Sequence, residues 1–486
     1  MTDKKSDKFS ASRRNVLGVT AASTLTLAGG LSLSNDSLAA NKTGRYTAPR
    51  KKPGTSDYDV IVIGGGMAGV SAARETSKAG LRTLVLEARN RLGGRTFYSK
   101  FAGENVELGA NYLHWLQPHI WAEVERYALP IDDTPSAVNP ERWIYLKDGK
   151  PVEADVAVLG AKVDRAMTEF CEKAREVFPQ PYNPYITDQW KEYSALTIQD
   201  RINQLKLDED VKLNLNAIWS IMSHAKCTEG GFLEMLRWWA NLGNNTIDFN
   251  NACSRYRLKN GTISLINAII EDSMAEVVLG TPVQKIEQKR NKIRVTTADG
   301  QTVTCKRLIY ATPLNTWVDV KFEPQLAELK LRVSRERHVG AGNKLHVRTR
   351  QNIGNVFLTA DDSFAPLQYG YTEHSGPSGT MLLSYGLDGK YDVNNLEKVS
   401  AMIKKFLPDV EVTDCYGYQW LLDPYSKGTW CTLRPHQFGL VPELQKPEGG
   451  IHFANSDIAT MWRGWMDGGI EMGIKKGHIV SRELTS

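Results

Sequence analysis

The stretch Asp59-Val-Ile-Val-Ile-Gly-Gly-Gly-Met-Ala-Gly69 is a short apolar run that leads into a G-x-G-x-x-G turn. Each glycine of this turn has a physical role in binding a dinucleotide. Gly64 permits the tight turn, Gly66 lets the backbone approach a pyrophosphate, and Gly69 lets the next helix pack closely on the strand. The N-terminus of that helix would offer free N–H groups and a partial positive charge to the phosphates.

The residues that follow complete a strand–turn–helix–strand unit. A helical segment closes at Gly80, and the apolar run Leu84-Val-Leu86 then ends at the acid Glu87. An acid about 20 residues after such a turn is placed to accept hydrogen bonds from a ribose. A lone glycine motif also occurs in surface turns that bind nothing. Here the strand, glycine turn, helix, second strand and acid follow one another in the expected order. That order predicts a dinucleotide site in an α/β fold with a Rossmann-type domain.

The bulk composition is that of an ordinary globular protein. The 486 residues are 41% hydrophobic and 24% charged, and the chain is long enough for two domains. The net charge of +5 comes from the N-terminus. Residues 1–40 carry five basic and three acidic residues, and residues 41–56 carry five basic and no acidic residues, which leaves −2 for the remainder. We therefore expect no nucleic-acid partner. The nine His and six Cys show no metal-ligand spacing, so no metal site is predicted.

The first 40 residues have the pattern of a twin-arginine signal peptide. Lys4, Lys5 and Lys8 precede Ser12-Arg-Arg-Asn-Val-Leu17, and a weakly apolar run then leads to Leu38-Ala-Ala40 as a cleavage site. We expect export to the periplasm in the folded state, because a chain must fold to hold a dinucleotide made in the cytoplasm. A disordered basic tail is the alternative. The run is too short and too polar to span a bilayer, and the chain ends without an apolar tail, so no membrane anchor is expected.

Signals of nucleotide binding occur at the start, middle and end of the chain. They predict one domain assembled from discontinuous pieces, with a second domain inserted between them. After a polar linker at 41–56, the expected cofactor-binding pieces are 57–133, 254–320 and 428–486, and the expected substrate-binding pieces are 134–253 and 321–427.

A second glycine loop between arginines, Arg89-Asn-Arg-Leu-Gly-Gly-Arg95, follows Glu87. Joined to the first motif, it resembles the flavin-containing amine oxidase family, and the resemblance covers nearly the whole chain beyond the linker. Within the family, the chain most resembles the bacterial nicotine and pseudooxynicotine amine oxidases. Other stretches that match the family or this group are Gly94-Arg-Thr-Phe97, Glu107–Tyr112, His114–His119, Thr281-Pro-Val283, Tyr310–Pro313, Ile451–Ala454 and Trp462–Gly469.

The resemblance implies FAD as cofactor, in a glutathione-reductase-like domain with an inserted α+β substrate domain. Glu87 would bind the adenosine ribose, Arg95 the pyrophosphate and the Val283 backbone the adenine. The final helix would begin near Met466 and aim its N-terminus at the flavin C2 carbonyl and N1. The full set of implied FAD-binding residues is Gly64, Gly66, Ala68, Gly69, Glu87, Ala88, Arg89, Gly94, Arg95, Gly109, Ala110, Asn111, Tyr112, Val283, Asp457 and Met466.

Some positions depart from the family pattern. Thr429 stands where covalently flavinylated members carry the attaching Cys, so FAD should be held non-covalently, and Cys431 is a weak substitute. Asn455 replaces a glycine near the flavin, and Ala110 replaces the second glycine of a Leu-Gly-Gly loop. Asn455 could shift the flavin or the pocket wall.

The implied reaction removes a hydride equivalent from the carbon beside a neutral amine nitrogen and passes it to flavin N5, which needs a dry and well-aligned slot. By resemblance, Trp430 and Trp465 form an aromatic sandwich in front of the flavin, and Lys344 holds a water near N5. The alternatives are two core tryptophans and a solvated strand lysine. His114 and Trp115 would either line the pocket or serve structural contacts.

These residues predict a FAD-dependent amine oxidase or dehydrogenase that converts a small primary or secondary amine to an imine, which hydrolyses to an aldehyde or ketone. Pseudooxynicotine or a nicotine-like amine is the candidate substrate. Trp465 replaces a smaller polar residue of nicotine oxidases, which disfavours nicotine itself. An L-amino-acid oxidase, with Arg463 or Arg434 binding the carboxylate, and a non-catalytic flavin-binding protein stay open, with a nicotinamide dehydrogenase as the fallback. Either O2 or a c-type cytochrome would reoxidise the flavin, and the resemblance suggests a homodimer.

Overall fold

A computed structural model describes residues 52–364 and 366–486. The predicted signal peptide at residues 1–40, and residues 41–51 of the predicted linker, lie outside the described residues. Among the residues described, no helix is both long enough and apolar enough to cross a bilayer.

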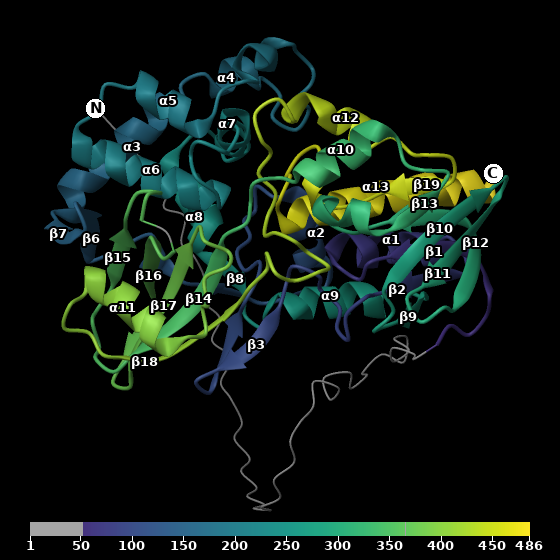
Figure 1. Cartoon of the computed structure of the whole chain (residues 1–486), viewed down its shortest axis with the longest axis horizontal. Coiled ribbons are helices and arrows are strands. Elements are labelled where there is room, and N and C mark those ends of the chain that lie inside the picture. The colour runs from purple at the N-terminus through teal and green to yellow at the C-terminus, as the bar shows by residue number, and fades with distance from the viewer. Residues whose placement is uncertain (1–51, 365) are drawn as a thin grey trace, which may run out of the picture. The chain divides into compact units, whose positions relative to one another are not determined.

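The apolar run that opens the described chain forms β1, inside an eight-stranded sheet (Figure 1). The strand order is β13-β10-β11-β12-β1-β2-β9, and β19 also pairs with β12. β1 is parallel to both of its neighbours, and Val60 to Ile63 are buried, as in a strand covered on both faces. The strands are β1 (Asp57–Ile63), β2 (Thr83–Leu86), β9 (Glu276–Val278), β10 (Val283–Lys289), β11 (Lys292–Thr297), β12 (Thr302–Tyr310), β13 (Lys321–Glu323) and β19 (Ile451–Phe453).

The predicted strand–turn–helix–strand unit is confirmed, with α1 (Met67–Lys78) directly after the glycine turn. Gly64 has φ +104°, a conformation that favours glycine. A Cβ on Gly69 would lie 1.8 Å from the Gly64 carbonyl oxygen, so the close packing of helix on turn also needs glycine. α1 then packs along α13 (Met466–Thr485), which begins at the residue expected for the final helix.

A second, seven-stranded sheet has the order β18-β14-β17-β16-β15-β6-β7 and is largely antiparallel. Figure 1 shows it on the left, below a group of helices. Its strands are β6 (Arg142–Lys147), β7 (Lys150–Ala154), β14 (Asn343–Thr349), β15 (Val356–Thr359), β16 (Tyr369–Gly376), β17 (Gly379–Gly386) and β18 (Val412–Tyr418). Two short antiparallel pairs are β3 (Tyr98–Phe101) with β4 (Glu104–Glu107), and β5 (Ile131–Asp133) with β8 (Tyr256–Leu258).

The helices distribute between the two sheets. α6 packs against α3, α5 and α7 and also contacts β15 and β16, while α11 covers β18, β6 and β7. α9 and α13 pack against α1 beside the first sheet. The remaining bounds are α2 (Pro118–Arg126), α3 (Val156–Phe170), α4 (Ala174–Val177), α5 (Ile198–Gln204), α6 (Glu209–Ser223), α7 (Phe232–Asn241), α8 (Thr246–Ser254), α9 (Thr262–Glu271), α10 (Glu328–Glu336), α11 (Leu396–Phe406) and α12 (Val441–Leu444).

The α/β fold class is confirmed, but one predicted boundary is wrong. Residues 321–323 were assigned to the substrate-binding part, whereas β13 pairs in parallel with β10 and extends the first sheet. α10 then packs against the turn Leu314–Asp319, which directly precedes β13. The chain therefore leaves the first sheet after Glu323 rather than at residue 320, and α10 still packs beside that part of the chain.

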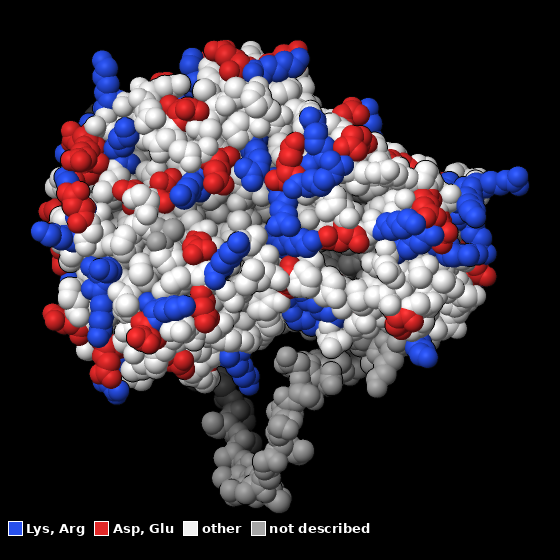
Figure 2. Space-filling model, in the orientation of Figure 1, with Lys and Arg blue, Asp and Glu red and all other residues white. Residues whose placement is uncertain are grey.

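The surface carries charges of both signs. Figure 2 shows Lys and Arg interspersed with Asp and Glu over the face in view. Some charged side chains form exposed ion pairs, such as Arg142–Glu153 and Lys162–Asp208.

Candidate active site

A cavity of about 550 Å³ lies beside the glycine turn of β1 and α1. A volume of this size lies within the range of cofactor sites. Twelve of the predicted FAD-binding residues line it: Gly64, Gly66, Ala68, Glu87, Ala88, Arg89, Gly94, Arg95, Gly109, Ala110, Val283 and Met466.

Two helix N-termini contribute to the wall of this cavity. Met67 and Ala68 come from the first turn of α1, and Met466 and Gly469 come from the first turn of α13. Within the described residues, no capping side chain accepts a hydrogen bond at either N-cap, Gly66 or Trp465. The uncapped N–H groups and the helix dipoles therefore favour negatively charged groups in the cavity, as the phosphates of a dinucleotide require.

Glu87 is held at the cavity wall by backbone donors. One carboxylate oxygen, Oε2, accepts a hydrogen bond from Gly65 N at 2.7 Å, and Oε1 accepts one from Arg89 N at 2.8 Å. Each carboxylate oxygen can accept further hydrogen bonds, so Glu87 retains capacity for ribose hydroxyls. Its placement fits the predicted role.

Arg95 bridges three segments at the cavity. Its Nη1 donates to the carbonyl oxygen of Thr429 at 2.7 Å, and its Nη2 donates to Asp457 Oδ1 at 2.7 Å. The other oxygen of Asp457 accepts from Leu314 N at 2.9 Å. Although burial opposes it, the Arg95 guanidinium holds the pKa of Asp457 below its usual range. Asp457 is not among the residues that line the cavity, and it holds Arg95, which does line it.

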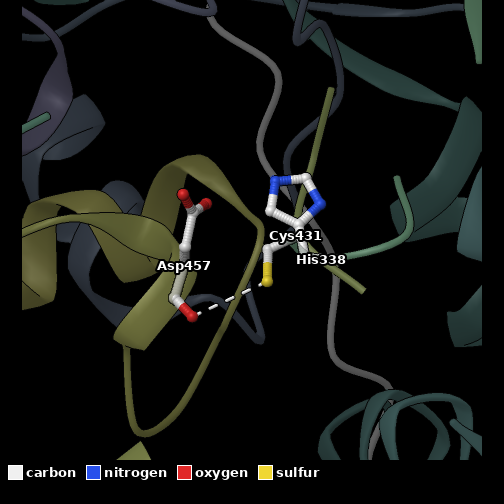
Figure 3. A group of neighbouring side chains, drawn as sticks. All are labelled: His338, Cys431 and Asp457. Carbon is white, nitrogen blue, oxygen red and sulfur yellow. Dashed lines mark hydrogen bonds between the residues drawn. The ribbon is translucent and has the colours of Figure 1, made fainter. Parts of the chain in front are cut away.

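A buried group of three side chains, His338, Cys431 and Asp457, lies next to Arg95 (Figure 3). An imidazole nitrogen, the thiol sulfur and a carboxylate oxygen of this group all lie within 4.8 Å of one another. The thiol of Cys431 faces the main-chain oxygen of Asp457 at 3.6 Å, and burial raises the thiol pKa well above its usual value. Both oxygens of Asp457 accept hydrogen bonds, one from Arg95 and one from Leu314 N, so Asp457 links this group to the cavity wall. Cys431 does not line the cavity, whereas Thr429 does.

A second, smaller cavity of about 130 Å³ shares part of its wall with the first. Asn111 and Tyr112, predicted beside the cofactor, line this smaller cavity and not the larger one. The hydroxyls of Tyr112 and Tyr371 are 2.7 Å apart. Residues that line both cavities are Gly109, Ala110, Lys344, Trp430, Gly464, Trp465 and Met466.

The two predicted sandwich tryptophans thus both line the wall that the cavities share. Trp430 donates its indole N–H to Met222 O at 2.9 Å. Trp465 packs edge-on against Trp238, with ring centroids 4.8 Å apart. Both rings are therefore held by the surrounding protein while they line the shared wall.

Lys344 is not a solvated strand lysine. It is buried on β14, and its Nζ donates to Gly109 O at 2.8 Å. Burial lowers its pKa to about 8, although the nearby Glu107 carboxylate acts in the opposite direction. A buried amine with a pKa this low is a candidate for proton transfer near neutral pH.

Four other candidate residues lie outside both cavities. His114 is buried, with its ring centroid 3.8 Å from that of Trp115 and the ring planes tilted by 32°, and burial lowers the pKa of His114 to about 4. Arg463 pairs with the buried Glu234, and Arg434 donates to the Arg337 carbonyl oxygen. Neither arginine is placed to bind a substrate carboxylate in the smaller cavity.

Sequence reasoning missed several residues of the site. Tyr371 and Tyr385 line the smaller cavity, and His224 lines the larger one. Tyr369 and Tyr371 stand two residues apart on one strand, so the sequence could have predicted that their side chains share a face. His224 follows a helix and carries no motif, so no local signal would have found it.

Comparisons with known proteins agree with this geometry. The sequence profile of a family described as "Flavin containing amine oxidoreductase" matches residues 67–476. A pseudooxynicotine dehydrogenase of Pseudomonas sp is 40% identical over 433 residues, covering 88% of this chain and 87% of that protein. A nicotine dehydrogenase of Pseudomonas putida is 36% identical and covers 100% of both chains. The solved structure of a putrescine oxidase bound to putrescine has a TM-score of 0.73 at 19% identity, covering 87% of this chain and 99% of that one.

The profile match covers most of the chain, and the residues that line the larger cavity fit the cofactor of that family. FAD is therefore the cofactor and amine oxidation the reaction, and the chain belongs to the flavin-containing amine oxidoreductase family.

Proposed function

We propose that the chain oxidises a small primary or secondary amine of nicotine breakdown, with pseudooxynicotine as the leading candidate. The observation that carries this proposal is the shared wall of the two cavities, which Lys344, Trp430 and Trp465 all line. The relatives named above, a pseudooxynicotine dehydrogenase and a nicotine dehydrogenase, support the substrate class.

FAD, when bound, supplies an acceptor for a hydride equivalent. The remaining roles fall to the protein. Trp430 and Trp465 present indole faces that attract a cationic amine and exclude water around it. Lys344, with its lowered pKa, can hold or accept a proton at Nζ as the amine becomes neutral. The imine that leaves the site hydrolyses to an aldehyde or ketone. Thr429 offers no thiol, so FAD is bound non-covalently.

Two features narrow the substrate. Neither Arg463 nor Arg434 lines the smaller cavity. Lys344, the only charged side chain among its described residues, already donates to Gly109 O, which disfavours an L-amino-acid oxidase. Trp465 and Trp430 both occupy the shared wall, which favours a slim or flexible amine over nicotine itself.

Export and reoxidation complete the proposal. The pattern around Arg13 and Arg14 supports folded export to the periplasm by the twin-arginine route. Either O2 or a c-type cytochrome then accepts the electrons, and the chain works as a homodimer. Replacing both arginines by lysine should retain the flavoprotein in the cytoplasm, and unchanged periplasmic activity would contradict the export proposal.

The decisive experiment mixes purified holoprotein, without oxygen, with pseudooxynicotine, nicotine, simple alkylamines and L-amino acids. We expect the flavin absorbance to bleach fastest with pseudooxynicotine and not at all with amino acids. Air or oxidised cytochrome c, added afterwards, identifies the acceptor that restores the colour. Bleaching by amino acids, or fastest bleaching by nicotine, would refute the proposed substrate.

A further inference from the structure

His224 is a fully buried histidine outside every motif named above, and it packs against Trp430 while it also lines the larger cavity. It follows the last turn of α6 in a left-handed conformation, with φ 53°. Its ring is stacked on the indole of Trp430, with centroids 4.0 Å apart and planes only 9° from parallel. One face of Trp430 is therefore covered by an imidazole, while the tryptophan also lines both cavities.

The ring of His224 is fixed by two hydrogen bonds. Its Nε2 lies 3.0 Å from the carbonyl oxygen of Asn343, and its Nδ1 lies 2.8 Å from the hydroxyl oxygen of Thr429. A carbonyl oxygen only accepts, so Nε2 carries the proton and Nδ1 accepts from the hydroxyl. These partners select one tautomer of the neutral ring.

The two hydrogen-bond partners of His224 stand next to residues that line both cavities. Thr429 precedes Trp430, and Asn343 precedes Lys344 on β14. Thr429 is itself held, because its N–H donates to Gly340 O at 2.9 Å and its carbonyl oxygen accepts from Arg95. His224 thus joins the end of α6 to the side chain of Thr429, next to Trp430, and to the backbone of Asn343, next to Lys344.

We propose that His224 is a positioning residue, which holds Trp430 in place and fixes its spacing from Lys344 through the stacked ring and the Thr429 hydroxyl. The proposal rests on Trp430 being a wall of the amine slot. A neutral ring suits this role, since a cation stacked on the indole would repel the incoming ammonium ion. Burial lowers the pKa of His224 to about 3, which keeps the ring neutral at physiological pH.

Two variants test this proposal on the FAD-loaded protein. His224→Asn tolerates the left-handed backbone and keeps an acceptor for Thr429, but removes the stacked ring. Thr429→Val keeps the side-chain shape and removes the hydroxyl that orients His224. His436→Asn is the matched control, because His436 is also left-handed, at φ 66°, but is exposed and far from any role in the site.

Three quantities are measured. They are the limiting rate of anaerobic flavin bleaching per bound FAD, the Kd by calorimetry of an amine that has no hydrogen on the carbon beside nitrogen, and the Tm. For His224→Asn we expect a limiting rate lower by about tenfold or more and a weaker amine Kd, because small misplacements in such slots are amplified in the rate. Thr429→Val should show a smaller loss of the same kind, and Thr429→Ser should recover most of it. In the His224→Asn background, Thr429→Val should add little, since Thr429 acts through the ring.

The controls separate the possible failures. A merely structural role would lower Tm and FAD content but not the rate per bound flavin. If both variants keep rate and Kd within about twofold of the parent protein, the positioning role is refuted. If His224→Asn does not fold, Thr429→Val decides in the same way. If Trp430→Ala leaves the amine Kd unchanged, the slot assignment itself is wrong; if it weakens binding while the other variants do not, only the role of His224 fails.

Discussion

At the scale of single residues, Lys344 combines burial, a lowered pKa and a place on the shared wall of the two cavities. Below a pH of about 8 the folded protein keeps Lys344 protonated, and above that pH the amine is neutral and can accept a proton. A cationic Lys344 repels an ammonium substrate, whereas a neutral one can deprotonate it.

We therefore expect kcat/KM to rise as the pH increases through about 8. Lys344→Met should abolish this rise and lower kcat/KM by about 100-fold, the usual scale of proton-transfer assistance. The profile is measured by steady-state kinetics between about pH 6 and pH 10. Lys476→Met is the control, because Lys476 is also buried with a pKa lowered to about 8 but bonds Gln445 O away from both cavities. A rise that persists in Lys344→Met would instead report ionisation of the substrate.

Arg95 offers a test of cofactor binding that separates affinity from stability. Arg95→Met removes the partner of the buried Asp457, which should destabilise the apoprotein by about 3–5 kcal/mol and weaken FAD binding. Adding Asp457→Asn should recover stability but not FAD affinity, as measured by urea unfolding and by FAD titration. Arg142→Met, in an exposed pair with Glu153, should change stability by only about 0–1 kcal/mol. Recovery of FAD affinity in the double variant would mean that Arg95 does not contact the cofactor.

At the scale of elements, the contact between α1 and α13 brings two uncapped N-termini to one cavity. The contact is close because α13 presents glycines to α1. A Cβ on Gly473 would lie 2.3 Å from the carbonyl oxygen of Ala68, and one on Gly477 would lie 2.7 Å from Glu75 Cβ. Larger residues would push the helices apart and move the N-termini away from the cavity wall.

Gly473→Ala should therefore destabilise the protein by about 1–3 kcal/mol through overpacking, despite the better helix propensity of alanine. Gly160→Ala is the matched control on α3, where the added Cβ would meet nothing nearer than 4.0 Å. That variant should stabilise by up to about 1 kcal/mol. Thermal unfolding of apoprotein and holoprotein gives both values. Equal stabilisation by the two substitutions would show that the helices can separate freely.

At the scale of the whole molecule, the described structure leaves all six cysteines free. Burial raises the thiol pKa well above its usual value at Cys171, Cys227 and Cys431, which leaves little reactive thiolate. We expect six titratable thiols per chain after denaturation, and slow reaction in the native state, even in protein purified without reducing agent. Fewer than six in the denatured protein would mean that a disulfide forms, contrary to the fold.

Much of the cofactor site was predictable because its residues stand in short, contiguous motifs. The turn at Gly64 to Gly69 needs glycine for local backbone reasons, so the sequence pattern and the structure coincide. The resemblance to flavin-containing amine oxidases likewise rests on whole motifs, and the family profile confirms it. The strand β13, by contrast, is three residues long, which is too short for its period to reveal the sheet it joins.

The sequence by itself therefore determined the dinucleotide turn, the family, the cofactor and the start of the final helix. Only the tertiary structure decided that Asp457 holds Arg95, that Tyr112 belongs to the smaller cavity, and that His224 packs against Trp430. The physical reason is sequence separation. Asp457 and Arg95 are 362 residues apart, and Thr429 and His224 are 205 apart. Contacts over such distances arise from packing of the two sheets and their helices, and no local pattern of residue types encodes them.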